Sequence, residues 1–228
     1  MNTARVAPEN VNIDTLPYFF QSVITMAMNS MKKSNVVYGV ATNDANYSVS
    51  QAIRKDGKYK VVWTCNFYTS WKNMLQRCYS ESFQSRRPTY KGCSVVNEWL
   101  HFSNFKSWME NQEWRGNSLD KDILIPNNKI YAPDRCVFVP KVVNNFVEDG
   151  AAGRGQFMIG VTWDKAVSKY KSQCCNPFTR KQENLGLFTD ELLAHLAWKK
   201  RKHELACQLA DTCDNPRLAE ALRQRYAS

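Results

Sequence analysis

The segment from Asn117 to Asn145 constrains the fold of this chain more than any other stretch. Its sequence is NSLDKDILIPNNKIYAPDRCVFVPKVVNN. NSLDKDILI and RCVFVP have the apolar runs of two short strands, and PNNK between them is typical of a turn. KVVNNF then begins a short helix. The segment therefore predicts a β-hairpin that is followed directly by a helix.

Two acids of this segment, Asp120 and Asp122, lie two residues apart on the first predicted strand. Side chains at this spacing point to the same face of a strand. Like charges this close repel each other unless a positive charge lies between them. A divalent metal ion would supply that charge at a nuclease site, and Lys121, Lys129 or Arg135 would supply it in ordinary salt bridges. Both alternatives are open at this point.

The chain before this segment predicts a β-meander and two helices. In VVYGVATNDANYSVSQAIRKDGKYKVVWTC (36–65), the turn signals Asn43-Asp44 and Asp56-Gly57 separate short strands. YTSWKNMLQRCYS and VVNEWLHFSNFKSWMENQ each carry one apolar face at helical spacing, which is more typical of a core than of a binding platform. These faces consist of Trp71, Met74, Leu75 and Cys78, and of Trp99, Phe102, Phe105, Trp108 and Met109.

The chain after this segment changes in pattern. EDGAAGRGQ (148–156) is rich in glycine and alanine and is the candidate linker. FMIGVTW, KYKSQCC and ENLGLF predict three short strands, and DELLAHLAWKKRKHELACQLA predicts a helix with Thr189 as its N-cap. A second helix, NPRLAEALRQRY, has Asn215 as its cap and Pro216 at its first position.

These elements predict an α+β protein. We expect a lead-in at residues 1–35, in which DTLPYFFQSVITMAMNSMKK has helical character, and a first module at 36–147. A second module at 153–228 contains a three-stranded sheet and trailing helices.

The chain carries 31 Lys and Arg against 21 Asp and Glu, a formal charge of +10. This excess favours a polyanionic partner such as nucleic acid, through electrostatics that do not depend on base sequence. None of the eight cysteines belongs to a CxxC pair, so we expect reduced thiols and no structural zinc. The apolar patch from Tyr18 to Met28 is too short for a membrane span, which favours a cytoplasmic protein without a membrane partner.

Several motifs together resemble one known family. The chain contains YTSWKNMLQRCYS, PTYKGCSVVNEWLHFSNFKSWM, LDKDIL, NKIYAPDRCVFVPKVVNN and RGQFMIGVTW in this order, within residues 36–206. They resemble phage-type homing-endonuclease-like proteins, in which an HNH (ββα-metal) nuclease module precedes a DNA-binding module like the plant ethylene-response-factor domain. The resemblance implies metal-dependent hydrolysis of double-stranded DNA, with Mg²⁺ or Mn²⁺, in the cytoplasm of a phage host.

The resemblance also implies roles for residues of the opening segment. Asp120 corresponds to the metal-ligand acid, Asn128 to the asparagine that braces the strands, and either Asn144 or Asn145 to the helix ligand. Lys121 stands where the family has a histidine base. A lysine is protonated at neutral pH, so it would hold a phosphate rather than act as a base. Asp122 offers a second carboxylate to a hard cation.

In the module that the C-terminal part resembles, a three-stranded sheet lies in the major groove. The basic and aromatic residues expected to contact DNA are Arg154, Trp163, Lys165, Lys169, Lys171 and Arg180, with Arg86 and Arg87 on backbone phosphates. Lys169 and Lys171 share one strand face, and Tyr170 points to the other. The competing interpretation is that Trp163 and Tyr170 pack against the following helix.

Two further functions are open. Because Lys121 replaces the base, the protein would be an inactive descendant that binds DNA as a regulator. Alternatively, the HNH-like scaffold would bind a host or phage protein.

Overall fold

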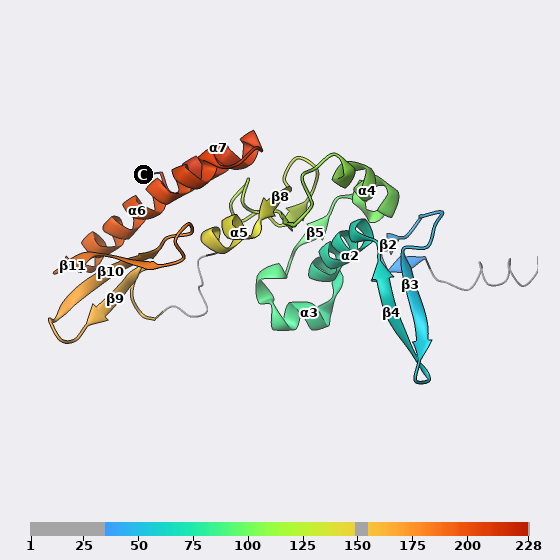
Figure 1. Cartoon of the computed structure of the whole chain (residues 1–228), viewed down its shortest axis with the longest axis horizontal. Coiled ribbons are helices and arrows are strands. Elements are labelled where there is room, and N and C mark those ends of the chain that lie inside the picture. The colour runs from blue at the N-terminus through green and yellow to red at the C-terminus, as the bar shows by residue number, and fades with distance from the viewer. Residues whose placement is uncertain (1–34, 149–154, 228) are drawn as a thin grey trace, which may run out of the picture.

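The computed structural model describes residues 35–148 and 155–227 as an elongated α+β protein with several small sheets (Figure 1). The α+β class is as expected from the sequence. The predicted lead-in up to Ser34, most of the predicted linker and Arg154 lie outside the described residues.

Two separate hairpins stand where a single meander was predicted. β1 (Val36–Val37) pairs with β2 (Ala41–Thr42), and β3 (Ser50–Lys55) pairs with β4 (Lys58–Thr64). The turn at Asp56-Gly57 is confirmed, with both residues at positive φ. Asn43-Asp44 does separate two strands, β2 and β3, but these strands belong to different hairpins. The Asp44 carboxylate accepts hydrogen bonds from Ser103 N and Oγ at 2.8 and 2.6 Å, at the start of a later helix.

The first core forms around two helices. α2 (Asn66–Tyr79) buries Trp71, Met74, Leu75 and Cys78, the four residues that the helical spacing predicted. α3 (Glu81–Arg86), η2 (Pro88–Tyr90) and β5 (Ser94–Val95) follow. The second predicted helix is divided at His101 into η3 (Asn97–Leu100) and α4 (Phe102–Glu110), because His101 is extended rather than helical.

Residues 117–147 form a strand pair and a helix. β6 (Asn117–Asp120) runs antiparallel to β8 (Val137–Pro140), and α5 (Lys141–Val147) follows β8 directly. β7 (Ile130–Tyr131) lies between them in the chain and pairs with β5 in parallel. The predicted first strand is too long, because the Asp120 side chain accepts hydrogen bonds from two following backbone N–H groups and turns the chain.

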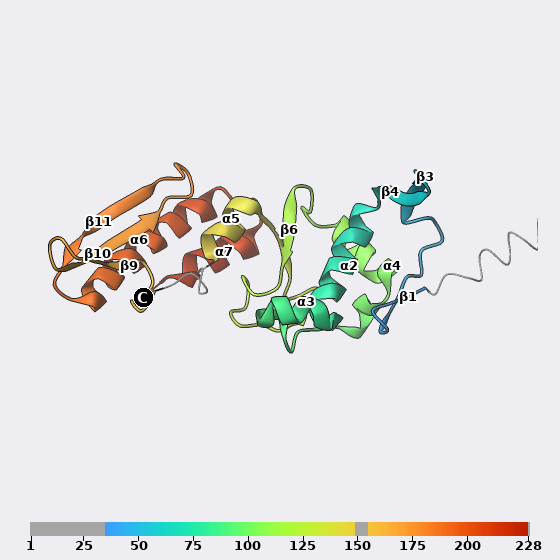
Figure 2. The ribbon, with the colours of Figure 1, turned by 90° about the horizontal axis from the view of Figure 1, so that it is seen from below.

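The C-terminal elements match their prediction closely. β9 (Val161–Asp164), β10 (Lys169–Cys175) and β11 (Gln182–Phe188) form an antiparallel sheet with β10 in the centre. α6 (Glu191–Asp211) covers one face of this sheet, and α7 (Pro216–Arg225) packs on α6 (Figures 1 and 2). Asn215 caps α7 as predicted, but Asp190 rather than Thr189 caps α6, since its carboxylate accepts from Leu193 N.

Strand β8 belongs to both hydrophobic cores that the described residues form. Its alternating side chains place Phe138 in the first core, with α2 and α4, and Val137 and Val139 in a second core. This second core joins β8 and α5 to α6 and α7, so it includes residues on both sides of the predicted linker. Lys202 of α6 adds a polar connection: its ammonium donates to Phe146 O at 2.6 Å and lies 3.8 Å from the Phe146 ring centroid.

All eight cysteines are free, as expected for reduced thiols, and five of them are buried. Within the described residues, no helix has the length and apolar character that crossing a bilayer requires.

Candidate functional site

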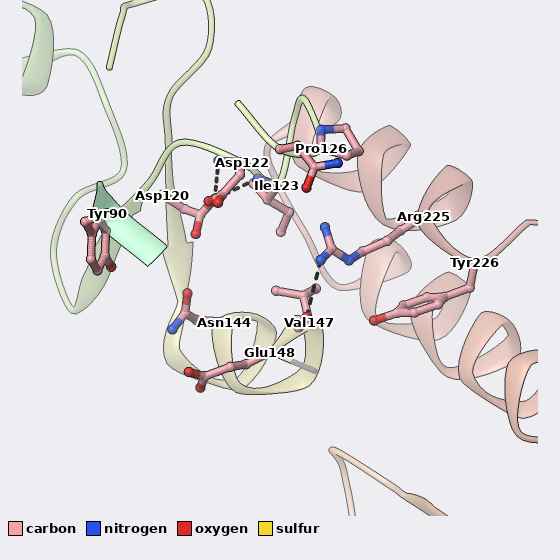
Figure 3. Close-up of a pocket in the computed structure, with 11 residues that line it drawn as sticks. Tyr90, Asp120, Asp122, Ile123, Pro126, Asn144, Val147, Glu148, Arg225 and Tyr226 are labelled. Carbon is pink, nitrogen blue, oxygen red and sulfur yellow. Dashed lines mark hydrogen bonds between the residues drawn. The ribbon is translucent and has the colours of Figure 1, made fainter. Parts of the chain in front are cut away.

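Asp120 and Asn144 lie on different elements and line the same pocket. Asp120 ends β6, and Asn144 lies on α5. The pocket has a volume of about 490 Å³, and Asp122, Glu148 and Arg225 also line it (Figure 3). A second hollow of about 190 Å³ shares Asp120, Asp122 and Asn144 and adds Arg77 and Lys121. The strand acid and the helix amide predicted from the sequence therefore do converge.

The Asp120 carboxylate is held in place by the backbone. Its Oδ1 accepts hydrogen bonds from Asp122 N at 2.9 Å and from Ile123 N at 2.7 Å. No side chain or backbone group of the described residues donates to its Oδ2. Burial raises the pKa of Asp120 above its ordinary value and the negative charge of Asp122 raises it further, against the lowering effect of the two backbone bonds. A cation in the pocket would offset both unfavourable effects.

Lys121 and Asp122 form the salt bridge that was one of the two alternatives. The Lys121 ammonium donates to Asp122 Oδ2 and to Asn128 O, both at 2.8 Å, and the residue is only 4% exposed. Asp122 follows the strand rather than lying on it, so the expected common face with Asp120 is wrong. The expectation that Lys121 holds a phosphate is not favoured either, because its ammonium is buried and already has two acceptors.

Asn128 braces the turn between β6 and β7. Its Nδ2 donates to Lys121 O at 2.7 Å and to Ile130 O at 2.8 Å, and its Oδ1 accepts from Ile130 N at 3.1 Å. The geometry gives Asn128 a structural role, which is the bracing role that the family resemblance implied. It fixes the loop that begins at Asp120.

Replacing Asn128 by alanine is expected to destabilise the protein by about 2–4 kcal/mol, because the buried carbonyl of Lys121 and the partly buried carbonyl of Ile130 lose their donor. Urea unfolding measures this change. Asn127→Gly is the matched control, since Asn127 is exposed and has a φ of 62° that glycine adopts freely. Equal stability of the two variants would contradict the bracing role.

The structure distinguishes between the two asparagines of α5. Asn144 faces the pocket with Asp120, whereas Asn145 is exposed and lines a different hollow of about 460 Å³ with Lys141, Arg180 and Lys202. Of the two candidate helix ligands, only Asn144 therefore lies at this site.

Four residues of the site were missed by the sequence analysis: Arg77, Tyr90, Glu148 and Arg225. The Arg77 guanidinium donates to Leu119 O at 3.2 Å and to the Tyr131 hydroxyl at 3.5 Å. Arg225 of α7 donates to Val147 O at 3.3 Å, and its guanidinium points into the pocket (Figure 3). Only Glu148 had a local signal, because it follows Asn144 by one helical turn.

None of the three histidines lines this pocket. His101 lies 3.8 Å from Asp44 at the start of α4. His195 contacts Ile159 O at 2.9 Å, and His203 lies 3.7 Å from the Cys207 thiol. The pocket therefore has no imidazole to accept a proton.

The predicted DNA-binding residues lie on two distant surfaces. Arg86 and Arg87 are exposed at the end of α3, and Arg180 is exposed in the turn between β10 and β11. The remaining candidates are Trp163, Lys165, Lys169 and Lys171 on or beside the three-stranded sheet.

Lys169 and Lys171 share the open face of this sheet. On β10, Ser172 and Cys174 are buried beneath α6, so the alternate residues point away from the helix. Trp163 packs edge-on against Tyr170, with ring centroids 4.8 Å apart. The two rings therefore pack on each other while Trp163 stays 39% exposed, and packing of this pair against α6 stays a prediction.

The donor set of the pocket fits a hard divalent cation. Among residues 35–148 and 155–227, no three His, Cys, Asp or Glu side chains gather to hold a metal ion. Mg²⁺, however, retains several waters and takes one or two carboxylates from a protein. Asp120 Oδ2 and the amide oxygen of Asn144 are oxygen donors of this kind. Comparisons with protein-family models, with curated proteins and with solved structures find no match to this chain.

Proposed function

We propose that this protein is an HNH-type endonuclease, a phage homing-type enzyme that binds double-stranded DNA and hydrolyses a phosphodiester with Mg²⁺ or Mn²⁺. One observation carries the proposal: Asp120 at the end of a strand and Asn144 on the helix after the paired strand line one pocket. The order β6, β8 and α5 supports a ββα core around that pocket.

Asp120 and Asn144 would hold the cation through oxygen atoms. Bound there, a divalent cation would stabilise the negative charge that develops on the leaving oxygen. The backbone N–H groups of Asp122 and Ile123 orient the Asp120 carboxylate and leave its second oxygen directed to other partners. Asn128 fixes the same loop through its hydrogen bonds to Lys121 and Ile130.

Two arginines supply positive charge at the edges of the site. Arg77 lines the smaller hollow beside Asp120, and Arg225 lines the larger pocket opposite it. A guanidinium matches the geometry of phosphate oxygens, so Arg225 is suited to hold a phosphate of the DNA backbone. Arg77 already donates to Leu119 O and to the Tyr131 hydroxyl, so it would contribute positive charge rather than a direct phosphate contact. The open face of the three-stranded sheet, with Lys169 and Lys171, would contact the duplex beyond the cleavage site.

A second candidate function is DNA binding without cleavage, as a regulator. The observation that favours it is the buried ammonium of Lys121 in a pocket that lacks a histidine. This alternative retains DNA affinity that falls steeply with salt, but it shows no cleavage with any divalent metal.

Nicking of a supercoiled plasmid tests the proposal. With Mg²⁺ or Mn²⁺ the wild-type protein is expected to nick DNA, and EDTA should abolish the reaction. Asn144→Ala should reduce the rate by about 10²-fold, because one metal ligand is lost, whereas Asn145→Ala should change it less than about threefold.

Asn145→Ala is a close control, since it makes the same change on the adjacent residue of α5. Equal rates for the two variants would remove Asn144 from the site. DNA binding by the wild-type protein without any metal-dependent nicking would favour the regulator.

A further inference from the structure

The β3–β4 hairpin exposes five large hydrophobic side chains: Ile53, Tyr59, Val61, Val62 and Trp63. Among the strands of residues 35–148 and 155–227, its two strands pair only with each other. Nearly every residue is exposed, including Ile53, Val61 and Trp63 at 51%, 59% and 47%, and Tyr59 at 78%. Figure 1 shows the hairpin projecting from the body that contains α2 and α4.

A two-stranded hairpin of this kind is only marginally stable in water. Its side chains contribute little to folding, because they are not buried against a core. A cluster of exposed aromatic and β-branched residues instead marks a surface that binds another molecule. The chemistry of the neighbouring residues indicates which kind of molecule this is.

The hairpin is strongly basic. Residues 50–64 contain Arg54, Lys55, Lys58 and Lys60 against the single acid Asp56, which gives four positive charges minus one negative, or +3. None of the four basic side chains forms an ion pair with another described residue. Lys55 lies directly across from Lys58, and Ile53 lies directly across from Lys60. The three lysines therefore share one face of the hairpin near its tip.

We propose that this hairpin is a second DNA-binding element, which enters the major groove of the same duplex that the pocket acts on. This inference rests on the proposed function. A two-stranded ribbon fits the major groove, which is roughly 12 Å wide. Lys55, Lys58 and Lys60 would then lie against backbone phosphates.

The arrangement of the molecule agrees with a shared duplex. The three-stranded sheet and the hairpin lie at opposite ends of the elongated chain, with β6 and α5 between them (Figures 1 and 2). The hairpin tip and the sheet face away from α6 are directed to the same side in Figure 1. One duplex along that side would contact both ends.

Charge also disfavours a second copy of this chain as the partner. A symmetric dimer through the hairpin would bring two surfaces of charge +3 together, and like charges at an interface oppose association. A polyanion neutralises the same charges. The apolar residues Tyr59 and Val61, on the other face with Arg54, would contact sugars and thymine methyl groups.

Duplex binding over a salt series tests this inference with two charge-matched variants. K58Q/K60Q changes the hairpin, and K199Q/K200Q makes the same change on α6, on the helix side of the sheet. For K58Q/K60Q we expect about tenfold weaker binding, and a log–log salt dependence that is shallower by about 1.8, or roughly 0.9 for each lost phosphate contact. The footprint on DNA should also become shorter at one end.

K199Q/K200Q is expected to bind within about threefold of the wild type. If both variants lose the same DNA affinity, or if K58Q/K60Q binds DNA as tightly as the wild type, the hairpin inference is overturned and the proposed function is unaffected. Absence of DNA binding by the wild type would overturn both. A concentration-dependent dimer that Y59S/V61S abolishes would replace DNA by a second copy as the occupant.

Discussion

Asp120→Asn is expected to reduce metal-dependent plasmid nicking by at least about 10³-fold while changing DNA affinity by less than about twofold. A metal site contributes several kcal/mol to the transition state, and each ~1.4 kcal/mol corresponds to a factor of ten in rate. Asparagine keeps the Oδ1 atom that accepts from Asp122 N and Ile123 N, so the turn after β6 should persist. The variant therefore removes the charge and leaves the geometry.

Thermal unfolding gives a measurement of the same variant that does not depend on activity. The folded state raises the pKa of Asp120, so it holds this proton more tightly than the unfolded chain does. The protonated Asp120 carboxyl therefore contributes to the free energy of unfolding at low pH. This contribution is lost as the pH rises above the pKa that Asp120 has in the unfolded chain and then above its pKa in the folded protein. At neutral pH without metal, the ionised carboxylate destabilises the fold, and Asp120→Asn should melt at the same temperature as the wild type or higher.

Metal should reverse this order. Mg²⁺ at tenfold its dissociation constant would stabilise the wild-type protein by about 1.4 kcal/mol and leave Asp120→Asn unchanged. Differential scanning fluorimetry with and without Mg²⁺ measures both values. If the metal raises both melting temperatures equally, or if the variant nicks DNA at the wild-type rate, Asp120 is not a metal ligand.

Gly160→Ala is expected to destabilise the protein by about 2–5 kcal/mol. Gly160 precedes β9 with a φ of +80°, a conformation that costs an L-residue roughly 1–2 kcal/mol. A Cβ at this position would lie 2.1 Å from Cγ of Trp198, a distance at which the indole must move. Overpacking of a core adds about 1–3 kcal/mol, and Trp198 belongs to the second core.

Gly116→Ala is the control for the backbone contribution alone. Gly116 has a φ of +75°, and an added Cβ would meet nothing within 4 Å. This variant should lose only about 1–2 kcal/mol. Urea unfolding of both variants separates the cost of the positive φ from the cost of the contact with Trp198. An equal decrease in the free energy of unfolding would show that the contact with Trp198 does not contribute.

Sequence patterns alone predicted the elements whose determinants lie within a few residues of one another. The buried face of α2, the full span of β10 and the Asn215 cap of α7 each follow from a helical or strand repeat or from one side chain next to a helix end. The strand, strand and helix order around Asp120 was predictable for the same reason.

Tertiary structure decided which of these residues meet. The Asp120 side chain turns the chain and directs Asp122 toward Lys121, which strand periodicity did not anticipate. Asn144 rather than Asn145 faces the pocket because Val143 and Phe146 anchor α5 in the second core.

The two arginines of the site could not be predicted from the sequence, for a different reason. Arg77 and Arg225 come to the pocket from α2 and α7, which are distant in the chain and carry no local pattern that relates them to Asp120. They approach it because β8 contributes to both cores and so fixes α2 and α7 around one hairpin. Periodicity and capping are local and can be predicted from neighbouring residues, whereas a pocket depends on the packing of side chains that the sequence keeps far apart.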